Sequence, residues 1–148
     1  QLSEKIAAVA SVTGSMTPET YALCNPQHPT PVLQIHGTSD ADVPYDGVFW
    51  SRSIDDVISY WVNYNNCDTD PTITSFQDID SLDGSTVEHF VYSGGDNGVT
   101  TEHMKVTGGN HTWSGADIDL PGLNTNQDIN ASIEVWKFFS RFDINGER

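Results

Sequence analysis

The chain has 148 residues, with 21 acidic against 6 basic side chains and a formal net charge of −15 at pH 7. Contact with a phosphate backbone or an anionic membrane surface needs clustered Lys and Arg, so this charge excludes nucleic acid and membrane as partners. The length predicts one domain, residues 1–148, with a core of moderate size, and no stretch approaches the roughly 20 apolar residues of a membrane span.

Two short apolar runs in the first quarter of the chain predict buried strands. The run 6–12 ends at Thr13-Gly14-Ser15, and the run 32–36 ends at Gly37. Both runs are too short for a typical helix and are bounded by Gly, which favours strands buried on both faces. The Pro-rich segment 18–31 between them is predicted to be a loop.

The middle of the chain predicts one helix followed by a loop. Apolar residues from Ile54 to Trp61 recur at helical spacing, and Ser53 with Asp56 has the form of a capping box with Asp in place of Glu. We therefore expect a helix over 53–66. The stretch 68–85 is rich in Asp, Thr and Ser and predicts a long surface loop.

The last third predicts a β-hairpin and a second helix. Strands 87–92 and 100–106 flank a Gly-rich turn, and His89 and His103 on these strands are expected to face solvent. An amphipathic helix is expected over 128–142; its side-chain spacing places four apolar residues together, Ile129, Ile133, Trp136 and Phe139. This order of elements predicts an α/β fold, with a mostly parallel sheet, flanking helices and a β-hairpin.

Asp40 and His111 are the candidate catalytic residues, because each follows an apolar strand in a tight loop. Open α/β sheets place ligands at the carboxyl ends of their strands. An Asp that orients a His, in the order acid before base, is two thirds of a serine-hydrolase triad. The alternative is that Asp40 caps a turn and that His111 is held by backbone bonds.

Other residues near the two loops have weaker claims to a role. Asp42 is the rival acid, His36 is expected to brace the Asp40 loop, and Trp113 is the candidate substrate-binding residue or a cover for the loop. No Gly-x-Ser-x-Gly elbow occurs in the sequence, and Ser15 is a poor substitute for its serine. We expect no metal site and no cofactor, because the two cysteines have neither the number nor the spacing of a zinc site.

The chain resembles the carboxy-terminal part of secreted bacterial esterases of the polyhydroxybutyrate depolymerase and feruloyl esterase group. The matching stretches are 6–15, 31–40 with Val43-Pro44-Tyr45, 60–67 and 108–113. The resemblance implies an α/β-hydrolase fold with Asp40 as triad acid and His111 as triad base. It also implies that Gln1–Lys5 is the tail of a helix and that the nucleophile elbow precedes Gln1.

The sequence therefore predicts a serine carboxyl-ester hydrolase that is inactive as this chain alone. Its substrate would be a polyester or a feruloyl or acetyl ester of plant polysaccharide, and its location extracellular or periplasmic. The alternative is a non-catalytic module that binds a carbohydrate or a protein. Sheet edges left unpaired by absent strands also predict a homodimer.

Overall fold

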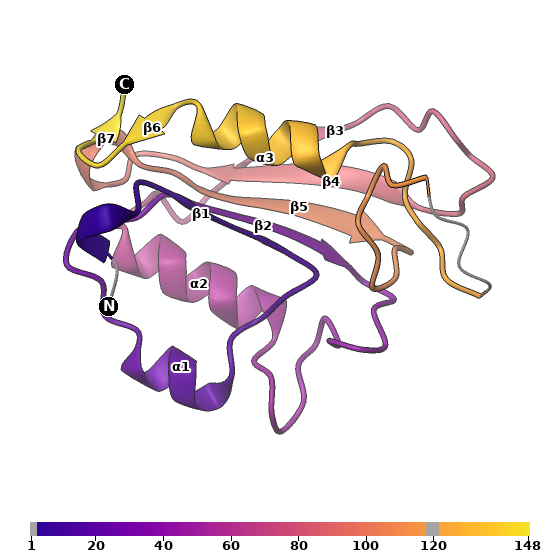
Figure 1. Ribbon diagram of the computed structural model, residues 1–148, viewed down its shortest axis with the longest axis horizontal. Helices are drawn as coiled ribbons and strands as arrows, with labels where there is room; N and C mark the ends of the chain where they lie inside the picture. Colours follow the sequence, from indigo (N-terminus) through magenta and orange to yellow (C-terminus); the bar gives the residue numbers. More distant parts are fainter. Residues whose placement is uncertain (1–2, 118–121) are drawn as a thin grey trace.

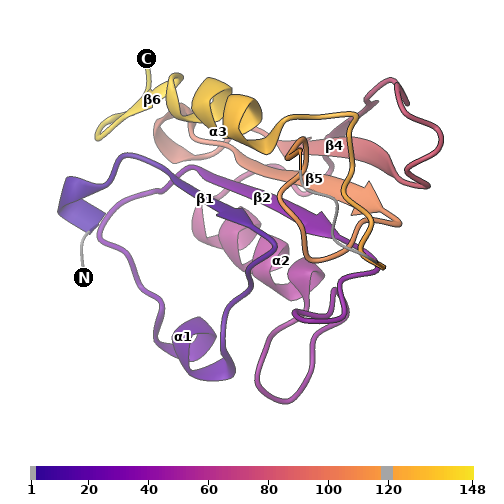
Figure 2. The ribbon, with the colours of Figure 1, turned by 45° about the vertical axis from the view of Figure 1, so that its right-hand side comes forward.

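A five-stranded mixed sheet forms the centre of the protein, for which a computed structural model describes residues 3–117 and 122–148 (Figure 1). In spatial order its strands are β1 (Val9–Val12), β2 (Val32–Gly37), β5 (Thr101–Thr107), β4 (Thr86–Tyr92) and β3 (Thr72–Ser75). Strands β1, β2 and β5 run parallel, whereas β4 and β3 run antiparallel to their neighbours. The carboxyl ends of β1, β2 and β5 consequently lie at the same end of the sheet, where the three arrowheads point (Figure 2).

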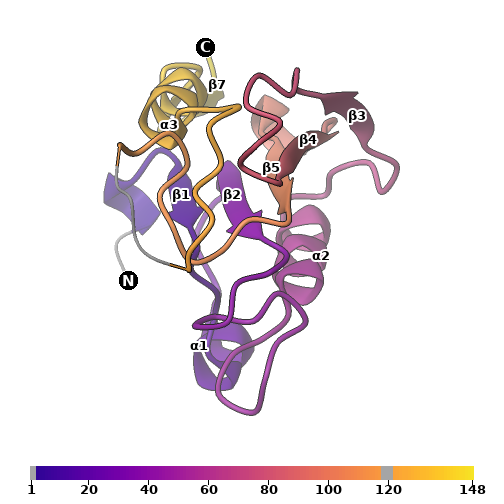
Figure 3. The same ribbon diagram turned by 90° about the vertical axis from the view of Figure 1, so that its right-hand side faces the viewer.

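Helices cover the two faces of this sheet in separate layers (Figure 3). On one face, α2 (Ile54–Tyr64) packs Val57 and Trp61 against Val32 of β2. On the other face, α3 (Ala131–Phe139) packs Phe138 into a cluster with Leu33 and other side chains of β2, β4 and β5. The chain ends in a two-stranded hairpin of β6 (Phe142–Asp143) and β7 (Gly146–Glu147).

Two elements lie in segments predicted to be loops. Helix α1 (Pro18–Leu23) begins after Thr17, whose hydroxyl accepts the Thr20 amide at 3.0 Å, and Pro18 suits the first helical position. Strand β3 is exposed along its whole length and, among the described strands, pairs with β4 alone. Its sequence Thr-Ile-Thr-Ser has too few apolar residues to show the alternation that marks a half-buried strand. At the amino end, Ser3–Lys5 forms a short 3-10 helix (η1), and Gln1 and Leu2 of the expected helix tail lie outside the described residues.

Helix α3 presents an unexpected face to the sheet. Ala131 and Phe138 are buried, whereas Ile133 and Trp136 are 52% and 71% exposed. Of the four apolar residues expected on one side, only Ile129, which precedes α3, is buried, so most of that side points outward. Beneath α3, β1 pairs with β2 alone among the described strands, which leaves one side of its backbone unpaired. An open strand edge and exposed apolar side chains thus lie at the same end of the sheet.

A buried ion cluster joins the end of α3 to the sheet. Glu102 of β5 accepts hydrogen bonds from His89 at 2.8 Å, from Thr100 at 2.7 Å and from Arg141. Burial raises the pKa of Glu102, but these hydrogen bonds outweigh burial and hold it below its usual value. His89 is therefore bonded rather than simply solvated, and the expectation that His103 faces solvent is wrong, because its side chain is buried beside Tyr45.

Within the described residues, no helix is long and apolar enough to cross a bilayer.

The remaining short element is a 3-10 turn, η2 (Asp96–Gly98), between β4 and β5. Cys24 and Cys67 are both free thiols; Cys67 is buried and lies 3.9 Å from the hydroxyl of Thr101.

Candidate active site

Asp40 is held in a turn directly after β2 by its own backbone neighbours. Its Oδ1 accepts the backbone N–H groups of Asp42 at 2.9 Å and Val43 at 2.8 Å. This is the local side-chain-to-backbone bonding that makes Asp a turn residue. The carboxylate side chain is fully buried. Since Oδ1 is occupied by two donors, Oδ2 is the oxygen that faces the rest of the site.

His111 reaches the same place because β2 and β5 are parallel and their following loops touch. Gly37 pairs with Val106 in the sheet, and a Cβ at Gly37 would lie 2.1 Å from the carbonyl oxygen of Gly109. This close approach requires glycine at position 37. The Ser39 N–H donates to the Gly109 carbonyl at 2.9 Å, so the loops are joined by backbone hydrogen bonds as well as by packing.

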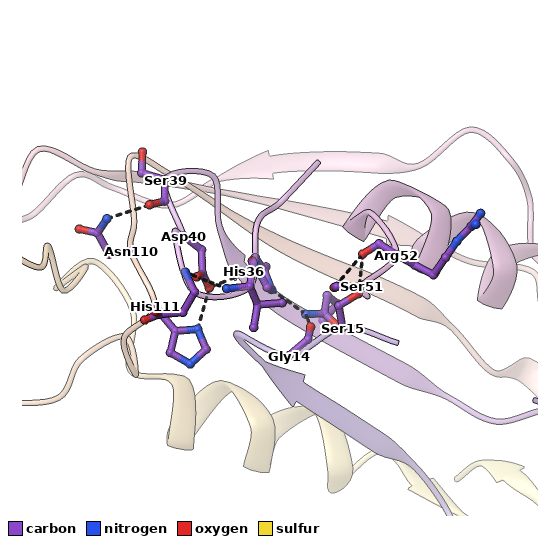
Figure 4. A network of polar contacts seen from close by, with 12 residues as sticks. Gly14, Ser15, His36, Ser39, Asp40, Ser51, Arg52, Asn110 and His111 are labelled. Carbon is purple, nitrogen blue, oxygen red and sulfur yellow. Dashed lines mark hydrogen bonds and ion pairs between the residues drawn. The ribbon is translucent and has the colours of Figure 1, made fainter. Parts of the chain in front are cut away.

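The structure brings Asp40 and His111 together, 71 positions apart in sequence. His111 Nδ1 lies 2.9 Å from Asp40 Oδ2 (Figure 4). A carboxylate can only accept, so Nδ1 carries the proton and Nε2 is left unprotonated in the neutral ring. The His111 side chain is 37% exposed, and no described residue is hydrogen-bonded to Nε2. His111 can therefore take a proton at Nε2, and the Asp40 carboxylate at Nδ1 stabilises the positive charge of the imidazolium that forms.

His36 braces the Asp40 loop, as the sequence indicated. Its Nε2 lies 2.9 Å from the Val43 carbonyl and 3.3 Å from Asp40 Oδ2, so one N–H is shared between the two acceptors. Burial lowers the pKa of His36, which favours the neutral ring. The second imidazole thus orients Asp40 without adding a competing positive charge.

Gln34 is a site residue that the sequence analysis missed. Its amide nitrogen lies 3.3 Å from His36 Nδ1 and donates to the Gly14 carbonyl at 2.9 Å, which links the end of β1 to the Asp40 loop. Gln34 is almost fully buried. Residues two apart on a strand point to the same face, so a Gln two places before His36 on a predicted buried strand could have indicated that the two side chains lie together.

The other sequence candidates lie outside this pair. Asp42 is exposed and contributes only its backbone N–H to Asp40. Trp113 is 47% exposed and donates its indole N–H to Ser132 of α3 at 3.1 Å, so its substrate-binding role stays a prediction. The Ser15 hydroxyl donates to the Arg52 carbonyl at 2.7 Å and points away from His111 (Figure 4).

Comparison with known proteins shows a distant similarity to one part of a larger enzyme. No protein-family model matches the chain. The chain is 23% identical over 147 residues to the bifunctional acetylxylan esterase/xylanase XynS20E of Neocallimastix patriciarum. The match covers 99% of this chain and 18% of that enzyme, so the chain spans less than a fifth of its relative's length. The protein is thus distantly similar to part of an esterase-containing enzyme.

Proposed function

We propose that Asp40 and His111 are the acid and base of a serine carboxylic ester hydrolase built on an α/β-hydrolase fold. The observation that carries this proposal is the 2.9 Å contact between His111 Nδ1 and a fully buried carboxylate, with Nε2 left unpaired among the described residues. The similarity to an acetylxylan esterase/xylanase supports an ester as the substrate. Of the ester substrates predicted from the sequence, an acetyl ester of plant polysaccharide agrees best with the activity named for that relative.

In this mechanism, Nε2 of His111 takes the proton of a serine hydroxyl as the oxygen attacks the ester carbonyl. Asp40 stabilises the imidazolium that results and keeps Nδ1 protonated throughout. The proton on Nε2 then passes to the leaving alkoxide, and water repeats the sequence to release the acid. The serine would come from a part of the protein outside these 148 residues, since the sequence holds no Gly-x-Ser-x-Gly elbow.

Ester hydrolysis by the full protein is the direct test of this function. Exchange of the triad Asp for Asn lowers kcat by about 10⁴ in a serine hydrolase while the geometry is kept. We expect Asp40→Asn and His111→Ala to cause losses of that order on p-nitrophenyl acetate, with Asp42→Asn as the matched control. Full activity in His111→Ala would refute the assignment.

The 148-residue chain alone offers a second test. We expect no turnover of p-nitrophenyl butyrate above the buffer rate. Hydrolysis that His111→Ala abolishes would show that the nucleophile lies inside the chain. A non-catalytic binding module is the rival function, and it predicts that Asp40 and His111 have no functional coupling.

A further inference from the structure

A second polar pocket, which neither Asp40 nor His111 lines, lies between α2 and the antiparallel side of the sheet. Its volume is about 280 Å³. The residues that matter for its chemistry are Tyr45, Asp55, Ser59, Phe90, Tyr92 and Lys105. Ligand pockets in proteins begin at roughly 300 Å³, so this pocket suits a ligand of about one ring.

The pocket exists because α2 covers only part of its face of the sheet. The helix packs on β2 and β5, while β4 lies farther along the sheet. Phe90 of β4 pairs with His103 of β5, and both side chains stand on the α2 face, with rings 6.0 Å apart and nearly stacked. Phe90 and Tyr92 are therefore only partly buried, although β4 is paired on both sides.

On one wall of the pocket, two hydrogen-bond acceptors, His103 and Asp55, share the single hydroxyl proton of Tyr45. His103 Nδ1 lies 3.1 Å from the Gln34 carbonyl, which can only accept, so Nδ1 carries a proton. Burial lowers the pKa of His103 to about 4, and the neutral ring must then accept at Nε2. The Tyr45 oxygen lies 3.0 Å from this Nε2 and 3.0 Å from Asp55 Oδ1, but it has one proton for two acceptors. Whichever acceptor takes this proton, Asp55 Oδ2 has no hydrogen-bond partner among the described residues and can accept from a group inside the pocket.

Lys105 supplies the complementary donor. Its ammonium lies 5.5 Å from the centre of the Tyr45 ring, and no described residue accepts a hydrogen bond from it. The pocket thus offers an acceptor at Asp55, a donor at Lys105, and hydroxyls at Ser59 and Tyr92. A ligand that both donates and accepts through several groups satisfies this set.

Charge and polarity narrow the ligand class. An anion would face Asp55 and a chain with a net charge of −15, and a cation would face Lys105. A wholly apolar ligand would strip water from Asp55 and Lys105 without replacing their hydrogen bonds, which is unfavourable. A neutral ligand with several hydroxyls and one apolar face meets both requirements, since the apolar face can rest on Phe90 or Tyr92.

We propose that this pocket binds one pyranose ring of a neutral sugar, with its hydroxyls on Asp55 and Lys105 and its C–H face on the aromatic side chains of β4. The site lies on the α2 face of the sheet, and His111 is not among the residues that line it. It does not depend on the proposed ester chemistry, because a sugar without an ester is sufficient to occupy it.

Amide chemical-shift mapping of the intact chain with methyl β-D-glucopyranoside and methyl β-D-xylopyranoside tests this proposal. A ligand this small binds with a dissociation constant on the order of 1 mM. We expect saturable shifts confined to the pocket residues, including Asp55, Phe90 and Tyr92. Shifts centred elsewhere, or none at about 50 mM glycoside, would overturn the proposal.

Matched variants separate the pocket from general surface effects. We expect Asp55→Asn and Phe90→Ala each to weaken binding about ten-fold, a typical loss for a central contact. Asp70→Asn and Phe49→Ala change exposed residues of the same types elsewhere on the surface and are expected to leave binding unchanged. Wild-type affinity in both pocket variants, or tighter binding of glucuronate than of the neutral glycosides, would refute a neutral-sugar site.

Discussion

Exchange of Asp40 for Asn is the sharpest perturbation of the candidate active site. In the variant, Oδ1 can still accept the N–H groups of Asp42 and Val43, while an amide NH₂ replaces Oδ2. That NH₂ faces the Nδ1–H of His111 and the Nε2–H of His36, and donors do not bond to donors. We therefore expect His111 to change tautomer, with the proton moving from Nδ1 to Nε2.

The size of the stability change follows from the same contacts. A hydrogen bond to a charged group contributes about 1.5–3 kcal/mol, and the new neutral bond to His111 recovers about 1 kcal/mol. His36 keeps its 2.9 Å bond to the Val43 carbonyl, so its loss is partial. We expect a net loss of about 2 kcal/mol in the free energy of unfolding. For a chain of this length, that corresponds to a decrease in Tm of about 4–8 °C.

Two measurements on the 148-residue chain check this reasoning. Nitrogen-15 shifts of the His111 ring report the tautomer, and urea unfolding reports the stability. Asp42→Asn is the matched control, because the Asp42 side chain is exposed and its backbone N–H is retained; we expect a change within about 0.5 kcal/mol. An unchanged His111 tautomer in Asp40→Asn would refute the coupling of the two residues.

Three further predictions concern the core, pH and association. Arg141→Met removes one of the three hydrogen-bond donors of the buried Glu102 carboxylate and should cost about 1.5–3 kcal/mol in urea unfolding, while adding Glu102→Gln should restore part of it. Burial lowers the pKa of His103 to about 4, so below pH 6.5 the unfolded chain binds a proton at this imidazole more readily than the folded chain does. The free energy of unfolding should therefore fall by about 3 kcal/mol from pH 7.5 to pH 4, and by less in His103→Gln. The open edge of β1 and the exposed Trp136 predict a homodimer by light scattering, weakened by Trp136→Lys; a wild-type monomer at high concentration contradicts it.

Local patterns in the sequence predicted the elements that hold the candidate site. The run before Gly37 is largely apolar and ends at glycine, and segment 100–106 before Gly108 was predicted as the second strand of a hairpin, so the positions of Asp40 and His111 after strands followed directly. Ser53 caps α2 as its spacing indicated, with its hydroxyl accepting the Asp56 N–H at 3.1 Å. The strand order was not predicted; the observed pairing of β2 with β5 brings together the two loops that the proposed Asp40–His111 pair requires to meet.

Features that depend on tertiary contacts were not predictable in the same way. The outward face of α3 was misjudged because helical spacing shows which side chains share a side, but not which side meets the sheet. Strand β3 gains its structure from pairing with β4 and carries no buried side chain of its own. The burial of His103 follows from the position of Tyr45, which lies 58 residues earlier in the sequence.

Strand register in the parallel part of the sheet has a consequence for how this protein can be altered. Adjacent residues along a strand are about 3.3 Å apart, so a single-residue slip between β2 and β5 would separate the imidazole from its carboxylate by more than a hydrogen bond tolerates. It would also turn the side chains of β5 to the opposite face. Inserted peptides or fused tags are therefore best placed near Leu82, which is 94% exposed. Segments 37–40 and 107–111 must keep their native length.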